Sequence, residues 1–141
     1  MNKAFLPALL IGTAMMSATV AYADGSLFDR MGGAPIVAKV VDQLLDLSMN
    51  DARTKRSFQK INLERLREKL NEQICALSNG PCQYSGDSMK DVHGGLDITD
   101  AEFNGLVENL TTALNANGVG LREKNELLKL LAPMKRDVVT K

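Results

Sequence analysis

Residues 80–99 read GPCQYSGDSMKDVHGGLDIT, and this stretch separates two amphipathic helical patterns. Gly80 and Pro81 predict the end of the helix before it, because glycine and proline close helices. Thr99 begins the pattern Thr-x-x-Glu, a capping box that predicts the start of the next helix. Between them lies His93, the single histidine of the chain. The stretch therefore predicts a loop-rich segment that carries the histidine between two long helices.

Apolar residues recur at helical spacing on both sides of this segment. The pattern just before it repeats every three or four residues, at Leu63, Leu66, Leu70, Ile74 and Leu77. Such spacing predicts an amphipathic helix. Three further stripes of this kind cover residues 36–45, 103–114 and 121–134, and Pro35 is expected at the first position of the earliest helix. With no alternating strand pattern and no repeat, the sequence predicts an all-α domain of four long helices joined by short ones.

The composition excludes several functional classes. The chain of 141 residues carries 17 basic and 17 acidic residues, so it lacks the basic surface that nucleic-acid binding requires. Two cysteines cannot form a four-thiolate zinc or iron–sulfur site, and one histidine cannot form a multi-histidine metal cluster. An apolar content of 45% over this length is enough for one domain with a single core.

Residues 1–23 read MNKAFLPALLIGTAMMSATVAYA and have the three parts of a signal peptide. Lys3 supplies the positive charge, an apolar run follows, and the motif Ala21-Tyr22-Ala23 is typical of a cleavage site. The alternative is a retained membrane anchor, but the apolar run is short for the ~20 residues that span a bilayer. We expect a mature domain over 24–141 that is exported to the periplasm and has no membrane contact after cleavage.

Several separated motifs follow one another along the chain. They are the glycine motif at 27–33, Tyr84-Ser85-Gly86, Met89, His93 with Gly94-Gly95, Ile98-Thr99, Phe103 and Ala132-Pro133-Met134. In this order they resemble the group I truncated haemoglobins over residues 26–139. Gln73-Ile74-Cys75 and Gly80-Pro81-Cys82 are most similar to exported proteobacterial members. The resemblance implies a two-over-two helical globin that holds haem b. Because the Cys-x-x-Cys-His attachment motif is missing, we expect non-covalent haem.

The resemblance implies that His93 is the proximal ligand of the haem iron. A ligating imidazole is neutral, and its second ring nitrogen usually donates to an acceptor that fixes the tautomer. Phe58 matches the aromatic residue that packs on the haem face. The positions assigned to the pocket wall are Leu45, Phe58, Leu66, Leu70, Ile74, Tyr84, Met89, Ile98, Phe103 and Leu106. These side chains also suit plain core packing, and the two roles are compatible because a cofactor pocket is part of the core.

The side of the pocket opposite His93 departs from the family pattern. Leu45 stands where most members have tyrosine, and Leu66 and Leu70 stand where they often have glutamine. A donor at these positions stabilises bound O2, which carries partial negative charge, by roughly 1.5–3 kcal/mol. That energy corresponds to about 10- to 150-fold in affinity. The leucines therefore argue against tight O2 storage.

Two roles stay open for Lys69, which the resemblance places beside this leucine pair. As a charged ammonium it would pair with a haem propionate, with its stem along the apolar wall. As a neutral amine it would be the sixth iron ligand, and neutralising a free lysine at pH 7 costs roughly 4.6 kcal/mol. Gln73, one turn further along the same helix, is expected to face solvent rather than the distal side of the pocket.

Two outcomes also stay open for Cys75 and Cys82. On one continuous helix their Cα atoms would lie about 10.5 Å apart, beyond the roughly 7 Å limit of a disulfide. The turn around Gly80 shortens that distance, and an oxidising compartment favours a bridge. We expect the bridge, and the alternative is a buried Cys75 with an exposed, free Cys82.

Three functions from different classes follow. The preferred one is a haem-binding globin that reversibly binds a diatomic ligand (O2, NO or CO), as a monomer or weak homo-oligomer rather than as an enzyme. The second is a periplasmic redox, electron-transfer or NO-detoxifying haem protein with an electron donor as partner, which iron ligation by Lys69 would favour. NO dioxygenation needs a stable O2 complex and a reductant, and the leucines and the export signal argue against both. The third is a haem-free helical interaction module.

Overall fold

The computed structural model describes residues 25–141, so the expected signal peptide at 1–23 lies outside the described residues. The long helices are α2 (Gly33–Asn50), α4 (Leu63–Leu77), α6 (Asp100–Ala116) and α7 (Leu121–Leu131). The short ones are α1 (Leu27–Arg30), α3 (Lys55–Phe58), α5 (Met89–His93), the 3₁₀ helix η1 (Ala132–Met134) and α8 (Lys135–Val138). Residues 25–141 form no strand, which confirms the predicted all-α class. Over the same range, no helix has the length and apolar character needed to cross a membrane.

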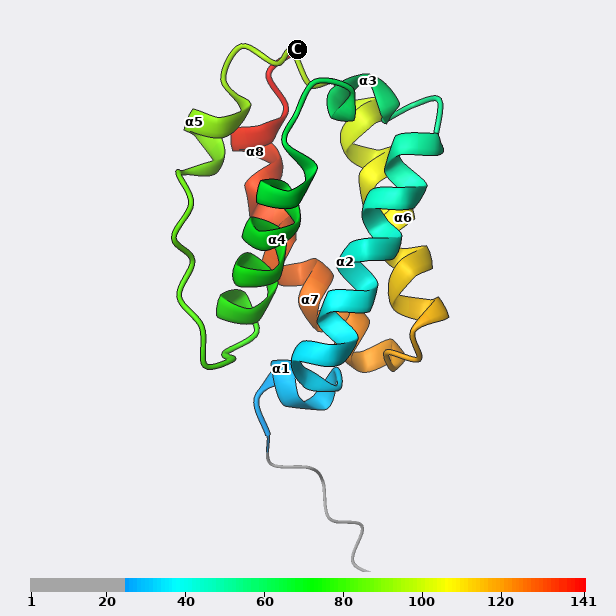
Figure 1. The fold of residues 1–141 in the computed structure, drawn as a ribbon, viewed down its shortest axis with the longest axis vertical. Coiled ribbons are helices and arrows are strands. Elements are labelled where there is room, and N and C mark those ends of the chain that lie inside the picture. The colour runs from blue at the N-terminus through cyan, green and yellow to red at the C-terminus, as the bar shows by residue number, and fades with distance from the viewer. Residues whose placement is uncertain (1–24) are drawn as a thin grey trace, which may run out of the picture.

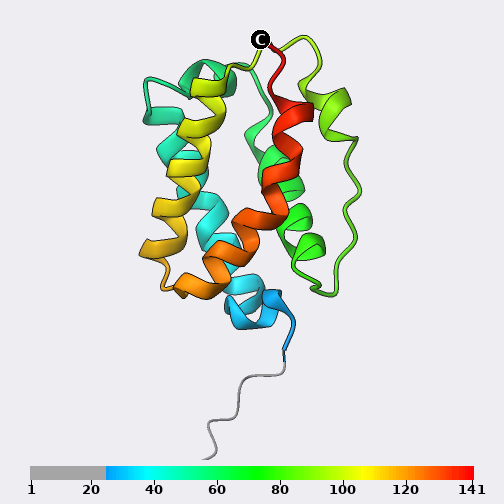
Figure 2. The same cartoon turned by 180° about the vertical axis from the view of Figure 1, so that it is seen from behind.

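The long helices form two layers. α2 and α4 pack together in the layer nearer the viewer in Figure 1. α6 and the run α7–η1–α8 form the layer that faces the viewer in Figure 2. α2 also packs on α6 and so joins the two layers. α5 stands at one side of the molecule, where it contacts α8 (Figure 1).

Polar side chains determine where the helices begin. Asn62 caps α4, because its side-chain oxygen accepts from the Arg65 N–H at 3.0 Å. At α6, Thr99 Oγ accepts from the Glu102 N–H at 3.2 Å, and the Glu102 carboxylate accepts from the Thr99 N–H at 2.9 Å. This reciprocal pair is the predicted capping box, and it satisfies donors that would otherwise lack partners at the helix start.

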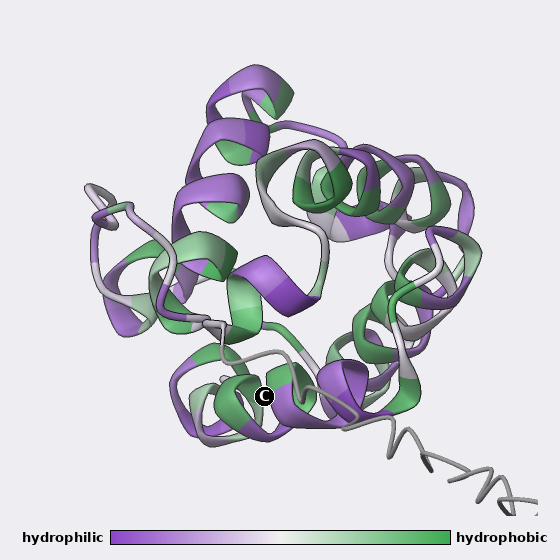
Figure 3. Ribbon diagram, turned by 90° about the horizontal axis from the view of Figure 1, so that it is seen from below, coloured by the Kyte–Doolittle hydropathy of each residue, from purple (hydrophilic) through white to green (hydrophobic). Residues whose placement is uncertain are grey.

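The core lies between the two layers. Val41 of α2, Ala113 of α6 and Leu127 of α7 are completely buried. Figure 3 shows hydrophobic and hydrophilic residues alternating along the same helices, as amphipathic helices require. α4 is different, because only Ile74 and Cys75 are buried on it. The other apolar residues of its stripe are half-buried, namely Leu63, Leu66, Leu70 and Leu77. The apolar face of α4 is therefore incompletely covered.

Two helix boundaries differ from the prediction. Pro35 is the third residue of α2 rather than the first, because the helix already begins at Gly33. The last apolar stripe, expected as one helix over 121–134, is divided, since α7 ends at Leu131 and a 3₁₀ turn follows. Pro133 explains the division, because proline lacks an N–H and its ring clashes with the preceding turn.

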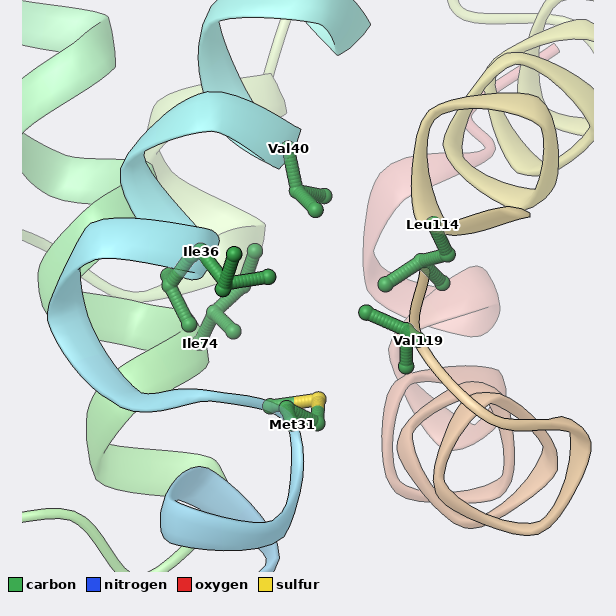
Figure 4. A pocket seen from close by; sticks show the side chains of 7 residues that line it. Met31, Ile36, Val40, Ile74, Leu114 and Val119 are labelled. Atoms are coloured by element: carbon green, nitrogen blue, oxygen red, sulfur yellow. The ribbon is translucent and has the colours of Figure 1, made fainter. Parts of the chain in front are cut away.

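An apolar seam joins the layers at the α1 end of the molecule (Figure 4). Its lining consists of Met31, Ile36, Val37, Val40, Ile74, Leu114 and Val119. In Figure 4 the side chains from α2 and α4 face Leu114 and Val119. The seam has no room for a water molecule, so it is close-packed core rather than a ligand cavity.

Candidate functional site

His93 is the last residue of α5, which begins after Ser88. Ser88 Oγ caps the helix by accepting from the Asp91 N–H at 3.1 Å. The His93 ring Nδ1 lies 2.8 Å from the carbonyl oxygen of Met89, one turn earlier. Because a carbonyl oxygen only accepts, Nδ1 carries the proton, and in the neutral ring Nε2 keeps its lone pair. An imidazole oriented in this way suits metal ligation through Nε2.

A pocket of about 270 Å³ lies between α4, α5 and η1. Its lining consists of Gln73, Ala76, Leu77, Tyr84, Met89 and Met134. Tyr84 and Met89 are two of the residues that the sequence assigned to a pocket wall. The Tyr84 hydroxyl donates to the carbonyl oxygen of Asp87 at 2.9 Å, and burial raises the pKa of this phenol. A mostly apolar wall with few polar groups is typical of cofactor pockets.

The prediction that Gln73 faces solvent is wrong. Its amide Nε2 lies 3.3 Å from Met89 Sδ and 3.7 Å from Met134 Sδ, so the side chain reaches from α4 to α5. Thioether sulfurs are weak acceptors, so the hydrogen bonds that the Gln73 amide donates to them are weak. The sequence already indicated that Gln73 points inward, because it is seven residues after Leu66 and four before Leu77. These three residues share one face of α4.

The other predicted wall residues spread over a wider region. The half-buried ones that pack against the core are Phe58, Leu66, Leu70 and Leu106. Phe103 is half-buried too, with the Lys135 ammonium 5.8 Å from its ring centre. Leu45 and Ile74 are buried members of the core, and Ile98 is buried just before α6. The structure thus brings Tyr84 and Met89 to the pocket beside α5 and places Leu45 and Ile74 in the core.

Lys69 belongs to a polar cluster with the loop after α4. Its Nζ lies 3.0 Å from Glu72 Oε1, 3.1 Å from Glu68 Oε1 and 2.6 Å from Ser85 Oγ. Glu72 also accepts from the Ser85 backbone N–H at 3.0 Å. That bond and Lys69 lower the pKa of Glu72 to about 2. The hydrogen bond to Glu72 in turn raises the pKa of Lys69, so the lysine is charged in this arrangement.

A disulfide joins Cys75, near the end of α4, to Cys82 in the loop, with the Cα atoms 5.9 Å apart. The turn between them contains Asn79 at a left-handed φ of 59°, and the Gly80 N–H donates to the Cys75 carbonyl oxygen at 2.8 Å. Gly80 has no room for a side chain, because a Cβ would lie 2.6 Å from Cys75 Sγ and 2.8 Å from Phe28 Cγ. The loop that leads to α5 is thus fastened to α4 by the bridge and by the polar cluster around Lys69.

Comparison with known sequences identifies the family. The model of the bacterial-like globin family matches residues 26–140. A group 1 truncated haemoglobin of Mycolicibacterium paratuberculosis is 33% identical over 115 residues, which cover 82% of this chain and 85% of the relative. The chain is a group I truncated haemoglobin. A group 1 truncated haemoglobin of Nostoc sp. is 27% identical over 116 residues, which cover 82% of this truncated haemoglobin and 98% of the relative.

Solved truncated haemoglobins share the fold. The Fe(III) form from Tetrahymena pyriformis matches with a TM-score of 0.79 at 23% identity, covering 83% of this chain and 100% of that one. The 2/2 haemoglobin from Synechococcus sp. PCC 7002, in the cyanomet state and with covalently attached haem, matches with a TM-score of 0.77 at 22% identity and the same coverage. The expected two-over-two helical arrangement is confirmed.

The residues of this truncated haemoglobin fit the haem that the globin family implies. His93 does not line the pocket itself, but its ring is hydrogen-bonded to the backbone of Met89, which does. The pocket alone is smaller than the roughly 300–1,000 Å³ of typical ligand sites. Half-buried Phe58, Leu66 and Leu70 pack against the core and keep apolar surface partly exposed. Both cysteines are in the disulfide, which leaves no thiol for attachment of a haem vinyl group.

Proposed function

We propose that this truncated haemoglobin binds haem b non-covalently through His93 and binds a diatomic gas reversibly at the iron. The observation that carries the proposal is the bond between His93 Nδ1 and the carbonyl oxygen of Met89, a residue that lines the 270 Å³ pocket. This bond orients the ring with its proton on Nδ1, the tautomer in which Nε2 ligates iron. When bound, haem supplies an iron centre for O2, NO or CO.

The residues expected opposite His93 offer no ligand to the iron, which leaves its sixth position open and favours gas binding over electron transfer. Leu45, Leu66 and Leu70 have neither a lone pair for the iron nor a hydrogen-bond donor for a bound gas, so they leave the position open without stabilising O2 strongly. Lys69 is occupied by Glu72 and Ser85 and carries its proton. Ligation of iron needs the neutral amine. We therefore expect no lysine in the sixth coordination position.

We further propose that the mature domain 24–141 acts in the periplasm. The signal-peptide pattern of residues 1–23 supports export. The Cys75–Cys82 bridge suits an oxidising compartment, because cytosolic reductants keep most thiols reduced.

Optical spectra of the mature domain, reconstituted with haem, test this function. The wild-type protein should show a saturable Soret band that changes on reduction and on addition of CO. His93→Ala should lose haem affinity, whereas Lys90→Ala, a matched change of an exposed residue on the same helix, should not. Lys69→Ala should leave the ferric spectrum unchanged.

Two results would contradict the proposal. A missing Soret band, or one that His93→Ala leaves unchanged, would favour a haem-free helical module. A low-spin ferric spectrum that disappears in Lys69→Ala would establish lysine ligation and favour a redox role.

A further inference from the structure

α5 carries His93 but is not held in place by its own buried side chains. The helix has five residues, and none of them is buried. The residues that follow, 94–97, are all exposed. A helix this short is not stable by itself. Beyond its packing on α8 and the contact of Met89 with Gln73, the position of His93 therefore depends on contacts that fix the chain on either side of α5.

On the C-terminal side, Arg56 of α3 reaches this chain segment. Arg56 Nη2 donates to the carbonyl oxygen of Asp97 at 3.1 Å, and Nη1 donates to that of Leu96 at 3.3 Å. The Leu96 N–H donates in turn to the carbonyl oxygen of His93 at 3.1 Å. Two hydrogen bonds on the backbone of Leu96, one from Arg56 and one to His93, thus connect α3 to the histidine.

Glu102 holds the Arg56 guanidinium in one orientation. Arg56 Nε donates to Oε1 at 2.9 Å and Nη2 to Oε2 at 2.8 Å, a paired geometry that lysine cannot reproduce. Glu102 is only 8% exposed and also accepts from Ser57 Oγ and the Thr99 N–H, each at 2.9 Å. A buried carboxylate with all these partners is rigid.

The turn between α5 and α6 is also held from its other side. Gly95 and Asp97 have left-handed φ values of 76° and 52°, a conformation that is uncommon for a residue with a side chain. The Thr140 N–H donates to the carbonyl oxygen of Ile98 at 2.9 Å, and Figure 1 shows the C-terminus beside this turn. The turn therefore lies between the C-terminal residues and Arg56.

We propose that Arg56 is a positioning residue for His93. Its bonds to the carbonyl oxygens of Leu96 and Asp97 hold the turn after α5 and thereby set where the imidazole stands beside the pocket. The inference rests on the proposed function, because the placement of the ring matters to haem only if His93 ligates the iron. Loosening this turn should weaken retention of haem and alter the iron–imidazole bond.

Comparison of Arg56→Gln with Arg53→Gln tests the inference. Arg53 is the matched control, because it donates to the carboxylates of Asp51 at 2.9 Å and of Glu108 on α6 at 2.6 Å rather than to the turn. In haem-free protein, amide hydrogen exchange over residues 93–97 should become about tenfold faster in Arg56→Gln, the effect of losing about one net hydrogen bond. It should stay at the wild-type rate in Arg53→Gln.

The haem-bound protein supplies two further measurements. Arg56→Gln should release haem to an acceptor protein about tenfold faster than wild type. Its iron–histidine stretching band, measured by resonance Raman on the ferrous, ligand-free protein, should shift. Arg56→Lys keeps a cation beside Glu102 but loses the forked geometry, so it should change both readouts in the same direction even if Arg56→Gln folds poorly.

The outcomes separate positioning from general stability and from the proposed function itself. Equal exchange over 93–97 in the Arg56 and Arg53 variants, or unchanged haem release with an unshifted band, would overturn the positioning role. Faster exchange throughout α2 and α6 without a shifted band would mean a purely structural role and would overturn it too. A wild-type protein without a Soret band would overturn the proposed function, and the positioning role with it.

Discussion

At the scale of single residues, the charge of Glu102 connects the fold to the candidate site. The Arg56 guanidinium, with the Thr99 N–H and the Ser57 hydroxyl, lowers the pKa of Glu102 from 4.5 to about 2. Because this pKa is depressed in the folded state, the ionised carboxylate stabilises the fold fully above pH 4.5. The contribution is lost as the pH falls from there toward about 2.

Glu102→Gln should therefore be less stable than wild type at neutral pH, and the difference should shrink in acid. The reason is that protonated glutamic acid and glutamine are both neutral, so little distinguishes the two proteins once Glu102 is protonated. Urea unfolding of both proteins at a series of pH values between about 7 and 2.5 measures the free energies. A difference that stays constant over this range would show that the charge of Glu102 does not stabilise the fold.

Lys69 supports a second prediction about charge. Its hydrogen bond to Glu72 is the main cause of its raised pKa, and Glu68 contributes less. Glu72→Gln should thus lower the pKa of Lys69 toward the ordinary 10.5 by more than Glu68→Gln, the matched control on the same helix. An NMR titration of the lysine ¹³Cε shift measures both variants. Equal decreases would mean that Glu72 has no special role.

The sequence predicted which residues belong to the candidate site better than it predicted which residues they bond to. The family motifs pointed to His93, Tyr84 and Met89, and the last two line the pocket. Pairs such as Lys69 with Ser85, or Arg56 with Asp97, join residues that are distant along the chain. Only tertiary packing brings such residues together, so no local pattern reveals them.

At the scale of helices, prediction succeeded where an apolar stripe was long. α4 and α6 carry clear periodic patterns and a cap, and both appear where expected. α3 has four residues and α5 has five, too few for a helical period to be visible. These two short helices hold Arg56 and His93. The least predictable elements therefore lie next to the candidate site.

The disulfide between Cys75 and Cys82 sets a prediction at this scale. It closes a loop of eight residues (75–82), which stabilises the fold by roughly 2.5 kcal/mol in the chain-entropy model. Replacing both cysteines by serine should lower the free energy of unfolding by about this amount, and wild type under reducing conditions should behave in the same way. Urea unfolding with and without dithiothreitol measures this effect. The double variant itself is the control, because dithiothreitol should not change its stability.

At the scale of the whole molecule, the packing of the helices leaves the apolar face of α4 partly uncovered. Leu66, Leu70 and Leu77 of α4 are half-buried, while the apolar seam at the α1 end of the molecule is closed to water. The family motifs predicted the two-over-two arrangement correctly. They could not predict which apolar residues the packing would bury and which it would leave partly exposed, because helical periodicity identifies a face but not the neighbour that covers it.

This uncovered surface predicts that haem stabilises the whole domain. A group that binds only the folded state adds about 2.7 kcal/mol when its free concentration is one hundred times its Kd. The melting temperature of the mature domain should therefore rise with haem concentration, and His93→Ala should require more haem for the same rise. Lys90→Ala, an exposed change on α5, is the control and should follow wild type. A melting temperature independent of haem would mean that the half-buried leucines serve packing alone, whereas equal rises in wild type and His93→Ala would mean that haem is held by apolar contact without the imidazole.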